Sequence, residues 1–288
     1  MAVVEIPVRG AFALAEGMRL GFGHRVSADD DDAMRMAFVL DGYREPAAVA
    51  VTQPAPDLVR VDVVAGDPDA AARQTARILS LDVDGTRWDA LAASDPLLSR
   101  VVAARPGLRP PLFHSAYECL LWAVLSARRP AARMAVVRDR FAAEHGAVFD
   151  VAGQTVAAMP VPERMAEITA FEGLPDVILE RMRAIGAEAA AGLLDTEALR
   201  ARDPDEVAAE LRRLPGIGPF SSEMVTVRAL GHTDALPSDE PRVRAAAAGL
   251  LGRDALSQAE FTEMAEAWRP WRTWAVVAIR AGAPLVDR

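Results

Sequence analysis

The sequence predicts an α+β protein in which an N-terminal antiparallel β-sheet with helices precedes an all-α region. Two observations support this prediction. Short Val-rich runs that alternate between apolar and polar residues occur only before about residue 86, and such runs are typical of strands with one buried face. The rest of the chain reads as helices separated by Pro and Gly, which interrupt regular structure. The 288 residues are enough for about two to three domains with a well-buried core.

The first 85 residues contain four predicted strands and two predicted helices. Pro68 favours a helix that starts at Asp67 and runs to about Leu79, because proline suits a first helical turn. A second helix is expected over Ala11–Leu20, and the acidic run Asp29–Asp32 is expected to be a solvated loop. The strands are predicted over Val3–Val8, Met34–Leu40, Ala47–Gln53 and Leu58–Val64.

The remaining chain is predicted to contain no strand. The Pro- and Gly-rich stretch Arg105–Pro111 reads as a rigid connector, followed by a buried helix over Ser115–Leu125. An Arg-rich helix is expected over 128–140, beginning near Pro130. Further helices are predicted over 162–171, 175–192, 195–202, 204–213, 219–231, 240–251, 257–267 and 271–281.

The composition limits the chemistry. All 32 basic residues are arginine, which excludes a side-chain Schiff base and a phosphate loop gripped by lysine. The net charge of −9 argues against a protein that holds anionic polymers by bulk charge. Residues 101–140 nevertheless carry seven arginines against two acidic residues. This basic segment is either a polyanion contact or a solvated helix face, and charge alone favours the solvated face.

The single cysteine, Cys119, excludes an internal disulfide framework, a cysteine-ligated iron–sulfur cluster and a multi-cysteine zinc site. It lies in an apolar run, so we expect a small buried side chain. Its solitary occurrence fits a reducing compartment. We expect a cytoplasmic protein with no membrane span, because no 18-residue apolar stretch exists and the N-terminus does not read as a signal peptide.

The most informative segment is Leu214-Pro-Gly-Ile-Gly-Pro-Phe-Ser-Ser-Glu-Met224. Gly216 and Gly218 allow a tight turn between two helices, because glycine adopts backbone angles that other residues disfavour. Ile217 can then pack inward, while turn N–H groups and the next helix N-terminus form an anion site. An ordinary helix-turn-helix is the alternative for the Gly turn alone.

The full pattern resembles the helix-hairpin-helix motif of DNA-repair glycosylases. The resemblance implies that the hairpin grips a DNA phosphate beside the lesion, through Gly216, Ile217, Gly218 and Ser221. It also implies that main-chain carbonyls can hold a structural monovalent cation, Na⁺ or K⁺. No cofactor and no iron–sulfur cluster are expected to be required. The cation-binding carbonyls would belong to Arg212, Leu214 and Ile217.

Asp239 is the expected catalytic carboxylate. In this superfamily a Gly- and Pro-rich loop after the hairpin carries an Asp two residues beyond a Pro, and Pro237-Ser238-Asp239 matches that placement. A carboxylate can stabilise the positive charge that develops on deoxyribose and can orient or deprotonate water. Asp234 and Glu240 are nearby acids, and a helix N-cap is the common alternative role for such an Asp.

Bifunctional relatives carry a Lys six residues after the hairpin Leu, where this chain has Phe220. The resemblance therefore implies a monofunctional hydrolase without Lys-dependent lyase activity. The stretch Ala267–Ala275, with the sequence AWRPWRTWA, looks like one in the DNA-3-methyladenine glycosylase II family. The connector Arg105–Arg109 also matches that family's linker.

The resemblance implies a core of two helical subdomains behind the N-terminal sheet. The predicted boundaries are 1–88 for the N-terminal α/β domain, 89–111 plus 233–288 for the subdomain with Asp239, and 112–232 for the subdomain that ends in the hairpin. The expected partner is double-stranded DNA with damaged bases, and the expected state is a monomer near the nucleoid.

The sequence departs from the family at the wedge and at the base pocket. Arg128 occupies the position of the side chain that fills the DNA stack, where an Arg can insert or bind a phosphate. Phe220 holds one aromatic pocket position, while Glu240 and Arg280 replace two others. Arg280 would repel a cationic base unless it pairs with Glu240. Compensating aromatic surfaces could come from Tyr117 and Trp122, whose alternative role is core packing.

The leading hypothesis is a monofunctional DNA glycosylase that excises damaged purines, with alkylated purines as the expected substrates, after base flipping. Two alternatives stay open: a non-catalytic helix-hairpin-helix DNA-binding protein, and a glycosylase of the same fold for another lesion.

Overall fold

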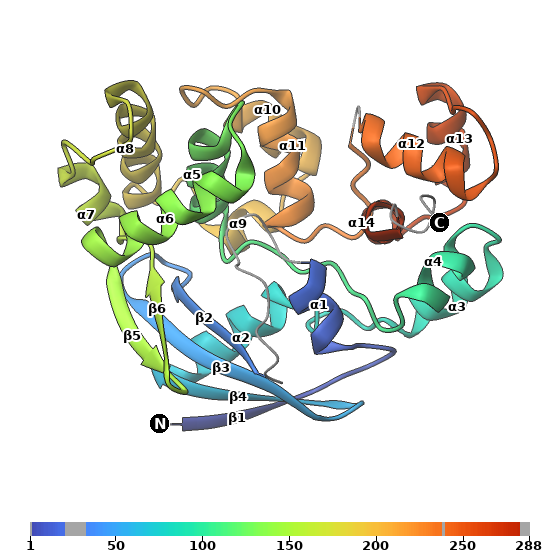
Figure 1. The fold of residues 1–288 in the computed structure, drawn as a ribbon, viewed down its shortest axis with the longest axis horizontal. Coiled ribbons are helices and arrows are strands. Elements are labelled where there is room, and N and C mark those ends of the chain that lie inside the picture. Colours follow the sequence, from blue (N-terminus) through green and yellow to red (C-terminus); the bar gives the residue numbers. More distant parts are fainter. Residues whose placement is uncertain (1, 21–32, 238–239, 283–288) are drawn as a thin grey trace.

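The computed structural model describes residues 2–20, 33–237 and 240–282, which form an antiparallel sheet beneath two groups of helices (Figure 1). The sheet has the strand order β1-β4-β3-β2, and every neighbouring pair is antiparallel. Its strands are β1 (Ala2–Pro7), β2 (Met34–Val39), β3 (Pro46–Ala55) and β4 (Leu58–Ala65). The predicted α+β fold and the four predicted strands are therefore confirmed.

Two helices accompany the sheet, α1 (Leu14–Leu20) and α2 (Pro68–Ile78). Asp67 caps α2 by accepting a hydrogen bond from the Ala70 N–H at 2.8 Å, and Pro68 occupies the first helical turn. Both features are typical helix starts. The apolar face of α2 is buried with the sheet valines, which gives this part of the chain a core of its own.

A second hairpin contradicts the prediction that no strand follows residue 86. It consists of β5 (Ala147–Val151) and β6 (Gln154–Ala158), which lie beside β2 in Figure 1. Its two-residue turn, Ala152-Gly153, has φ values of 49° and 79°. Backbone with φ > 0 at both positions suits a tight hairpin. The turn lacks the Asn-Gly or Asp-Gly pair that normally signals such a hairpin in a sequence.

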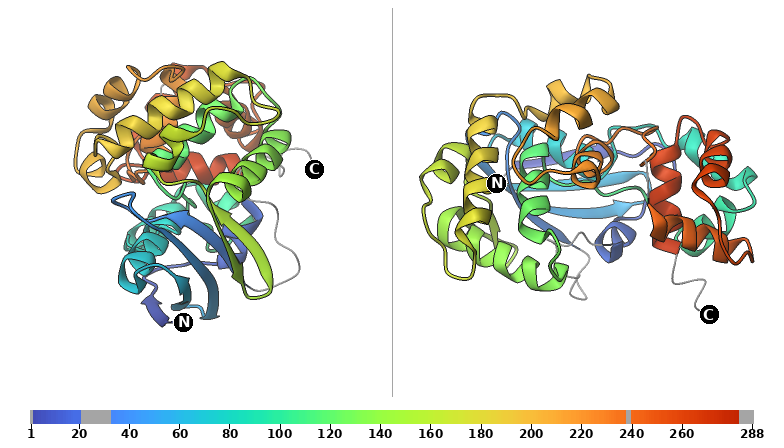
Figure 2. Two further views of the ribbon diagram at one scale, coloured as in Figure 1. Left: turned by 90° about the vertical axis from the view of Figure 1, so that its left-hand side faces the viewer. Right: turned by 90° about the horizontal axis from the view of Figure 1, so that it is seen from above.

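The helices form two groups that lie side by side when seen from above (Figure 2). One group surrounds an apolar cluster that runs from Phe113 to Leu230 and also contains Val39 and Tyr43 of the sheet domain. Its helices are α5 (Ala116–Ser126), α6 (Ala131–His145), α7 (Pro162–Glu167), α8 (Asp176–Ala190), α9 (Thr196–Arg200), α10 (Pro204–Leu211) and α11 (Pro219–Arg228).

The other group combines segments from before and after the first group. It buries Trp88, Trp268, Trp271 and Trp274 in a separate cluster, so the Trp-rich stretch packs a core. The three largest buried clusters run close to the predicted domain limits, and a fourth, small cluster joins the sheet to the β5–β6 hairpin. The division into domains stays a prediction. The helices of this group are α3 (Thr86–Ser94), α4 (Leu98–Ala104), α12 (Pro241–Leu250), α13 (Gln258–Glu266) and α14 (Arg272–Gly282). Within the described ranges, no helix is long and apolar enough to cross a membrane.

The connector before α5 is fixed by Arg109, which is 2% exposed. Its guanidinium donates to the carbonyls of Ala11 at 2.9 Å and Ser80 at 3.0 Å, and lies 5.5 Å from the centre of the Trp274 ring. Gly107 has φ of +74°, and a Cβ there would lie 2.6 Å from the Ala13 nitrogen. The connector therefore joins the sheet domain to the Trp-rich group through contacts that few other residues could make.

Candidate functional site

The candidate site begins at the hairpin between α10 and α11. Asp203 caps α10 by accepting hydrogen bonds from the N–H groups of Asp205 and Glu206 at 2.9 and 3.1 Å. In the turn, the Ile217 N–H donates to the Leu214 carbonyl at 3.1 Å. Ile217 is 6% exposed and belongs to the same apolar cluster as α5 and α8. The prediction that Ile217 packs inward is confirmed, and its burial fixes the turn against the protein.

Only one turn glycine uses the left-handed region. Gly216 has φ of +86°, whereas Gly218 has φ of −101° and ψ of −177°, which is extended backbone. A Cβ built on Gly218 meets nothing within 4 Å, but one on Gly216 would lie 2.7 Å from Cδ of Arg181. The expectation that both glycines supply unusual backbone angles is therefore wrong for Gly218.

The start of α11 presents unpaired backbone donors. The N–H groups of Gly216, Gly218, Phe220 and Ser221 donate to no described residue, and Pro219 has no N–H. Proline at the first helical position has no N–H group, so this position adds no unpaired donor. Together with the positive end of the helix dipole, these donors are suited to an anion such as a phosphate.

The carbonyls expected to bind a monovalent cation lie in the same turn. The Leu214 carbonyl accepts the Ile217 N–H, whereas those of Arg212 and Ile217 accept no hydrogen bond within the described part of the chain. Two unpaired acceptors are compatible with a hard monovalent cation, because such cations prefer oxygen ligands. Among the described residues, no group of three or more His, Cys, Asp or Glu could hold a metal ion.

The loop that follows the hairpin is attached to the first turn of α14. The Thr273 N–H donates to the Thr233 carbonyl at 2.9 Å, and the Ala235 N–H donates to the Thr273 hydroxyl at 3.0 Å. Asp234 forms ion pairs with Arg272 at 2.7 Å and with Arg269 at 2.6 Å. Asp234, noted above as an acid near Asp239, is therefore held in place by two arginines. Asp239 itself lies outside the described residues.

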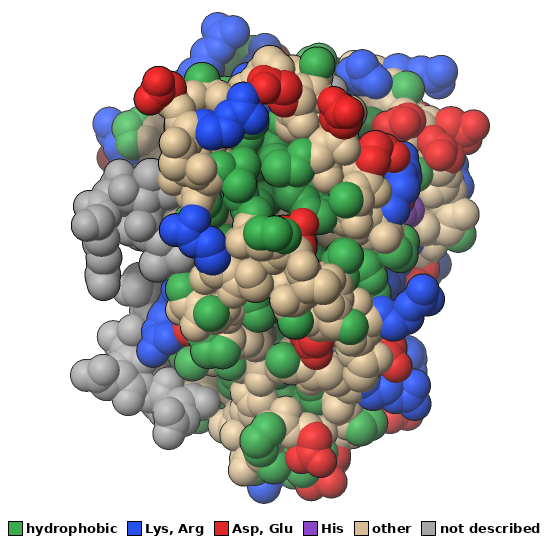
Figure 3. Space-filling model, turned by 90° about the vertical axis from the view of Figure 1, so that its right-hand side faces the viewer, with side chains coloured by type: hydrophobic (Ala, Val, Ile, Leu, Met, Phe, Trp, Pro, Cys, Tyr) green, Lys and Arg blue, Asp and Glu red, His purple; other side chains and the backbone are tan. Residues whose placement is uncertain are grey.

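Glu240 and Arg280 do not form the expected pair. Glu240 is the N-cap of α12, and its Oε1 accepts the Arg242 N–H at 3.3 Å. Arg280 is exposed on α14 and makes no ion pair with any described residue. The proposed neutralisation of Arg280 by Glu240 is therefore wrong, because the carboxylate of Glu240 serves its own helix. On the face that carries α12 and α13, arginines and acidic side chains are interspersed (Figure 3).

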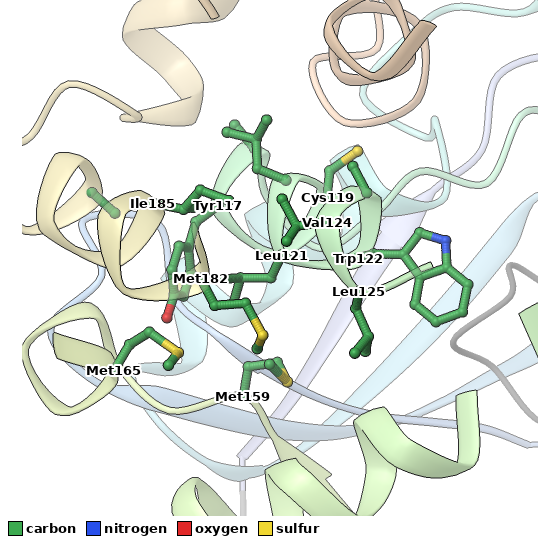
Figure 4. Close-up of a cluster of buried hydrophobic side chains, with 14 of the residues drawn as sticks. Tyr117, Cys119, Leu121, Trp122, Val124, Leu125, Met159, Met165, Met182 and Ile185 are labelled. Carbon is green, nitrogen blue, oxygen red and sulfur yellow. The ribbon is translucent and has the colours of Figure 1, made fainter. Parts of the chain in front are cut away.

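Tyr117 and Trp122 are core residues, which corrects their assignment to a base pocket. Tyr117 is fully buried, and its hydroxyl donates to the Pro160 carbonyl at 2.9 Å. Burial raises the pKa of this phenol well above its usual value. In Figure 4 Tyr117 points toward Met165, whereas Trp122 extends from another side of α5. Trp122 is 8% exposed and contributes to a small hollow beside Phe113. Among the aromatic residues that the structure describes, Phe220 is exposed, at 65%.

Arg128 lies at the tip between α5 and α6 and is exposed. Its φ of +55° is unusual for a residue other than glycine. Its guanidinium makes no hydrogen bond or ion pair with any described residue, so it is available to an external group. Other arginines of the basic segment have internal partners: Arg105 pairs with Glu16, Arg109 clamps the connector, and Arg138 lies near Glu118. Only part of the basic segment is therefore available to an external polyanion.

No protein-family model matches the chain. It is 32% identical over 279 residues to a Mycobacterium tuberculosis (strain CDC 1551 / Oshkosh) protein named "Probable bifunctional transcriptional activator/DNA repair enzyme AlkA", which covers 93% of this chain and 54% of that protein. It is 28% identical over 165 residues to the DNA-3-methyladenine glycosylase of Bacillus subtilis (strain 168), covering 56% of this chain and 54% of that protein. The chain thus spans about half the length of the curated relatives it matches.

The fold matches the 3-methyladenine DNA-glycosylase from Archaeoglobus fulgidus with a TM-score of 0.82, 19% identity and 98% coverage of both chains. At this identity the likeness concerns the fold alone. In sequence, the chain is similar to proteins named as a DNA repair enzyme and as a DNA-3-methyladenine glycosylase.

Two residues near the hairpin and its loop were not predicted. Asp234 was expected only as an acid near Asp239, although the two arginines of the Trp-rich stretch signal a carboxylate partner. Arg181 had no predicted role, because it lies on α8, 35 residues before Gly216. No local pattern links two positions so far apart in the chain.

Proposed function

We propose that the protein is a monofunctional DNA glycosylase that hydrolyses the N-glycosidic bond of damaged, primarily alkylated, purines in duplex DNA. The observation that carries this proposal is the hairpin turn with its unpaired N–H groups at Gly218, Phe220 and Ser221. A DNA phosphate is a natural ligand for such a turn, since backbone donors and a helix N-terminus bind anions without a charged side chain. This solves the problem of binding DNA with a net charge of −9.

The catalytic group in this proposal is the carboxylate of Asp239. Cleavage of the N-glycosidic bond develops positive charge on the deoxyribose, and a fixed carboxylate stabilises that charge. The same carboxylate can orient or deprotonate the attacking water. An alkylated purine leaves readily because it is already cationic, so the site needs no strong general acid.

Two side chains and one ion complete the proposed interface. Arg128 fills or flanks the gap left by the flipped nucleotide, since its exposed guanidinium has no internal partner. Phe220 offers an exposed aromatic ring at the hairpin. The carbonyls of Arg212, Leu214 and Ile217 would hold a monovalent cation that neutralises part of the phosphate charge. The protein would act as a monomer on cytoplasmic, nucleoid DNA and would need no other cofactor.

The test is release of methylated purines from duplex DNA by the wild type and by Asp239→Asn. We expect release by the wild type and a loss of at least about a hundredfold in the variant, as is typical when a principal charge-stabilising group is removed. Glu240→Gln is the matched control, because the amide oxygen can still accept the Arg242 N–H and cap α12. Its release rate should stay close to the wild-type rate.

Three outcomes would contradict parts of the proposal. Release that persists in Asp239→Asn would remove Asp239 from the mechanism. Equal losses in Asp239→Asn and Glu240→Gln would point to damage of the loop as a whole. Duplex binding without release from any damaged substrate would favour a non-catalytic DNA-binding protein.

A further inference from the structure

The side chain of Arg181, on α8, lies across the hairpin turn. A Cβ added to Gly216 would lie 2.7 Å from Cδ, 3.0 Å from Nε and 3.2 Å from Nη1 of Arg181. The guanidinium therefore occupies the space that any other residue at position 216 would claim. A helix remote in sequence thus brings a cationic group directly against the turn.

Arg181 has no internal acceptor. It is half-buried, yet it makes no hydrogen bond or ion pair with any residue in the ranges 2–20, 33–237 and 240–282. Nearby arginines behave differently. Arg183, two residues further along α8, donates to the Ala166 carbonyl at 3.0 Å, and Arg202 pairs with Glu210 at 2.6 Å. A half-buried arginine without an internal acceptor is available to an external anion, because a partly desolvated charge is costly unless it is paired.

We propose that Arg181 is a DNA-phosphate ligand that completes the hairpin site from α8. The inference rests on the proposed function and adds a residue to it. A guanidinium presents a planar fork of N–H donors that matches two phosphate oxygens, and the unpaired backbone donors of Gly218 and Phe220 belong to the same turn. The phosphate would thus supply the acceptor that Arg181 lacks within the protein.

This arrangement gives Gly216 a second role. Its left-handed backbone shapes the turn, and its missing side chain admits Arg181. An acidic protein would in this way place one cation where the DNA backbone arrives.

The experiment measures the Kd for a duplex with a stable abasic-site analogue, as a function of salt concentration. Arg181→Met keeps an unbranched apolar side chain over Gly216 and removes the guanidinium with its charge and its N–H donors, and Arg183→Met on the same helix is the matched control. We expect Arg181→Met to weaken binding about tenfold and to reduce the slope of log K against log salt by about one, as loss of one phosphate contact does. Arg183→Met should change Kd less than about twofold and leave the slope unchanged.

The variant Arg181→Lys provides a second test, in which Kd and its salt dependence are measured in the same way. It keeps the charge but not the planar fork, so we expect a wild-type salt slope with an intermediate Kd. Unchanged Kd and slope in Arg181→Met would overturn the inference, as would a lower unfolding temperature with an unchanged slope, which indicates packing alone. Wild-type protein that fails to bind the duplex would instead overturn the proposed function together with this inference.

Discussion

Arg272 holds Asp234 through both its side chain and its backbone. Arg272 Nε lies 2.7 Å from Asp234 Oδ1, and Nη2 lies 2.6 Å from the Asp234 carbonyl oxygen. The Arg272 side chain is 14% exposed and that of Asp234 is 28% exposed, so solvent screens the pair only partly. Because Asp234 lies five residues before Asp239 in the sequence, the Trp-rich stretch has a physical task beyond filling a core. It fixes the start of the loop that leads to the proposed catalytic residue.

Replacing Arg272 with Lys should therefore loosen this loop. Lysine cannot donate to the Asp234 carboxylate and carbonyl from one planar group, and loss of charge-assisted hydrogen bonds of this kind costs roughly 1–3 kcal/mol. We expect a lower unfolding temperature and a base-release rate that falls more than DNA affinity does. Thermal melting and single-turnover release measure the two effects.

Arg269→Lys is the control for this prediction. Arg269 also pairs with Asp234, but its side chain is 48% exposed, and exposed pairs contribute at most about 1 kcal/mol. Equal effects of the two substitutions would contradict the idea that the half-buried Arg272 contact holds the loop at Asp234 against α14.

The two hairpin glycines should respond differently to alanine. Gly216→Ala forces a residue with a Cβ into φ of +86° and displaces Arg181, which should reduce stability by about 1 kcal/mol or more. Gly218→Ala introduces a Cβ into open space on extended backbone, so its unfolding temperature should stay near the wild-type value. We expect both variants to bind duplex DNA less tightly, since both alter the anion-binding turn. A stability loss in Gly218→Ala equal to that in Gly216→Ala would contradict the described backbone.

Local patterns allowed the sheet and the hairpin to be predicted, while long-range packing escaped prediction. Alternating valines indicate strands because side-chain direction alternates along a strand, and the Pro-Gly-Ile-Gly pattern determines a turn within a few residues. The β5–β6 hairpin was missed because Ala152-Gly153 is a weak turn signal. The sequence leaves Tyr117 between base pocket and core, because α5 is apolar on all sides and no pattern separates the two roles. The role of Arg181 depends on how α8 packs against the turn.

Glu118 joins α5 to the sheet domain and should make stability depend on pH. Its carboxylate accepts the Val39 N–H at 3.1 Å and lies 3.0 Å from His114 Nδ1 and 3.5 Å from Arg138 Nη2. Burial alone would raise the pKa of Glu118, but the charges of His114 and Arg138 and the hydrogen bonds outweigh burial and lower that pKa below 4.5. The stabilisation by the Glu118 carboxylate is therefore present above pH 4.5, and it is lost as the pH falls through the lower pKa that this group has in the folded protein.

Glu118→Gln should cost about 3 kcal/mol at neutral pH, since it removes the buried carboxylate that interacts with His114 and Arg138. The difference in unfolding free energy between the wild type and this variant should shrink as the pH falls below 4.5. Denaturant titrations at several pH values measure it. Asp139→Asn is the control, because Asp139 is a more exposed partner of Arg138, at 40%. A difference between Glu118→Gln and wild type that is constant with pH would show that the Glu118 charge has no such role.

Cys119 should be unreactive in the folded protein. It is fully buried on α5, and burial raises the pKa of its thiol far above the usual value, so little thiolate is available to react. Iodoacetamide at pH 8 should leave native protein unlabelled, and the same reagent in denaturant should add one label per chain, since Cys119 is the single cysteine. Rapid labelling of the native protein would mean that α5 opens on the timescale of the experiment.

The absence of lysine leads to a direct test of the monofunctional assignment. A lyase reaction through a lysine Schiff base requires a side-chain amine, and no residue of this chain supplies one. Incubation with duplex DNA that contains an abasic site, in the presence of borohydride, should therefore yield no adduct on a side chain, whereas a glycosylase/lyase with a catalytic lysine should be trapped under the same conditions.

The variant Phe220→Lys places an amine at the position where bifunctional relatives carry theirs. Because the Phe220 side chain is 65% exposed, lysine should be accommodated there without loss of stability. If Phe220 faces the flipped nucleotide, Phe220→Lys should give a trapped adduct that peptide mapping assigns to position 220. A folded, DNA-binding Phe220→Lys variant that is never trapped would place this helix start away from the deoxyribose.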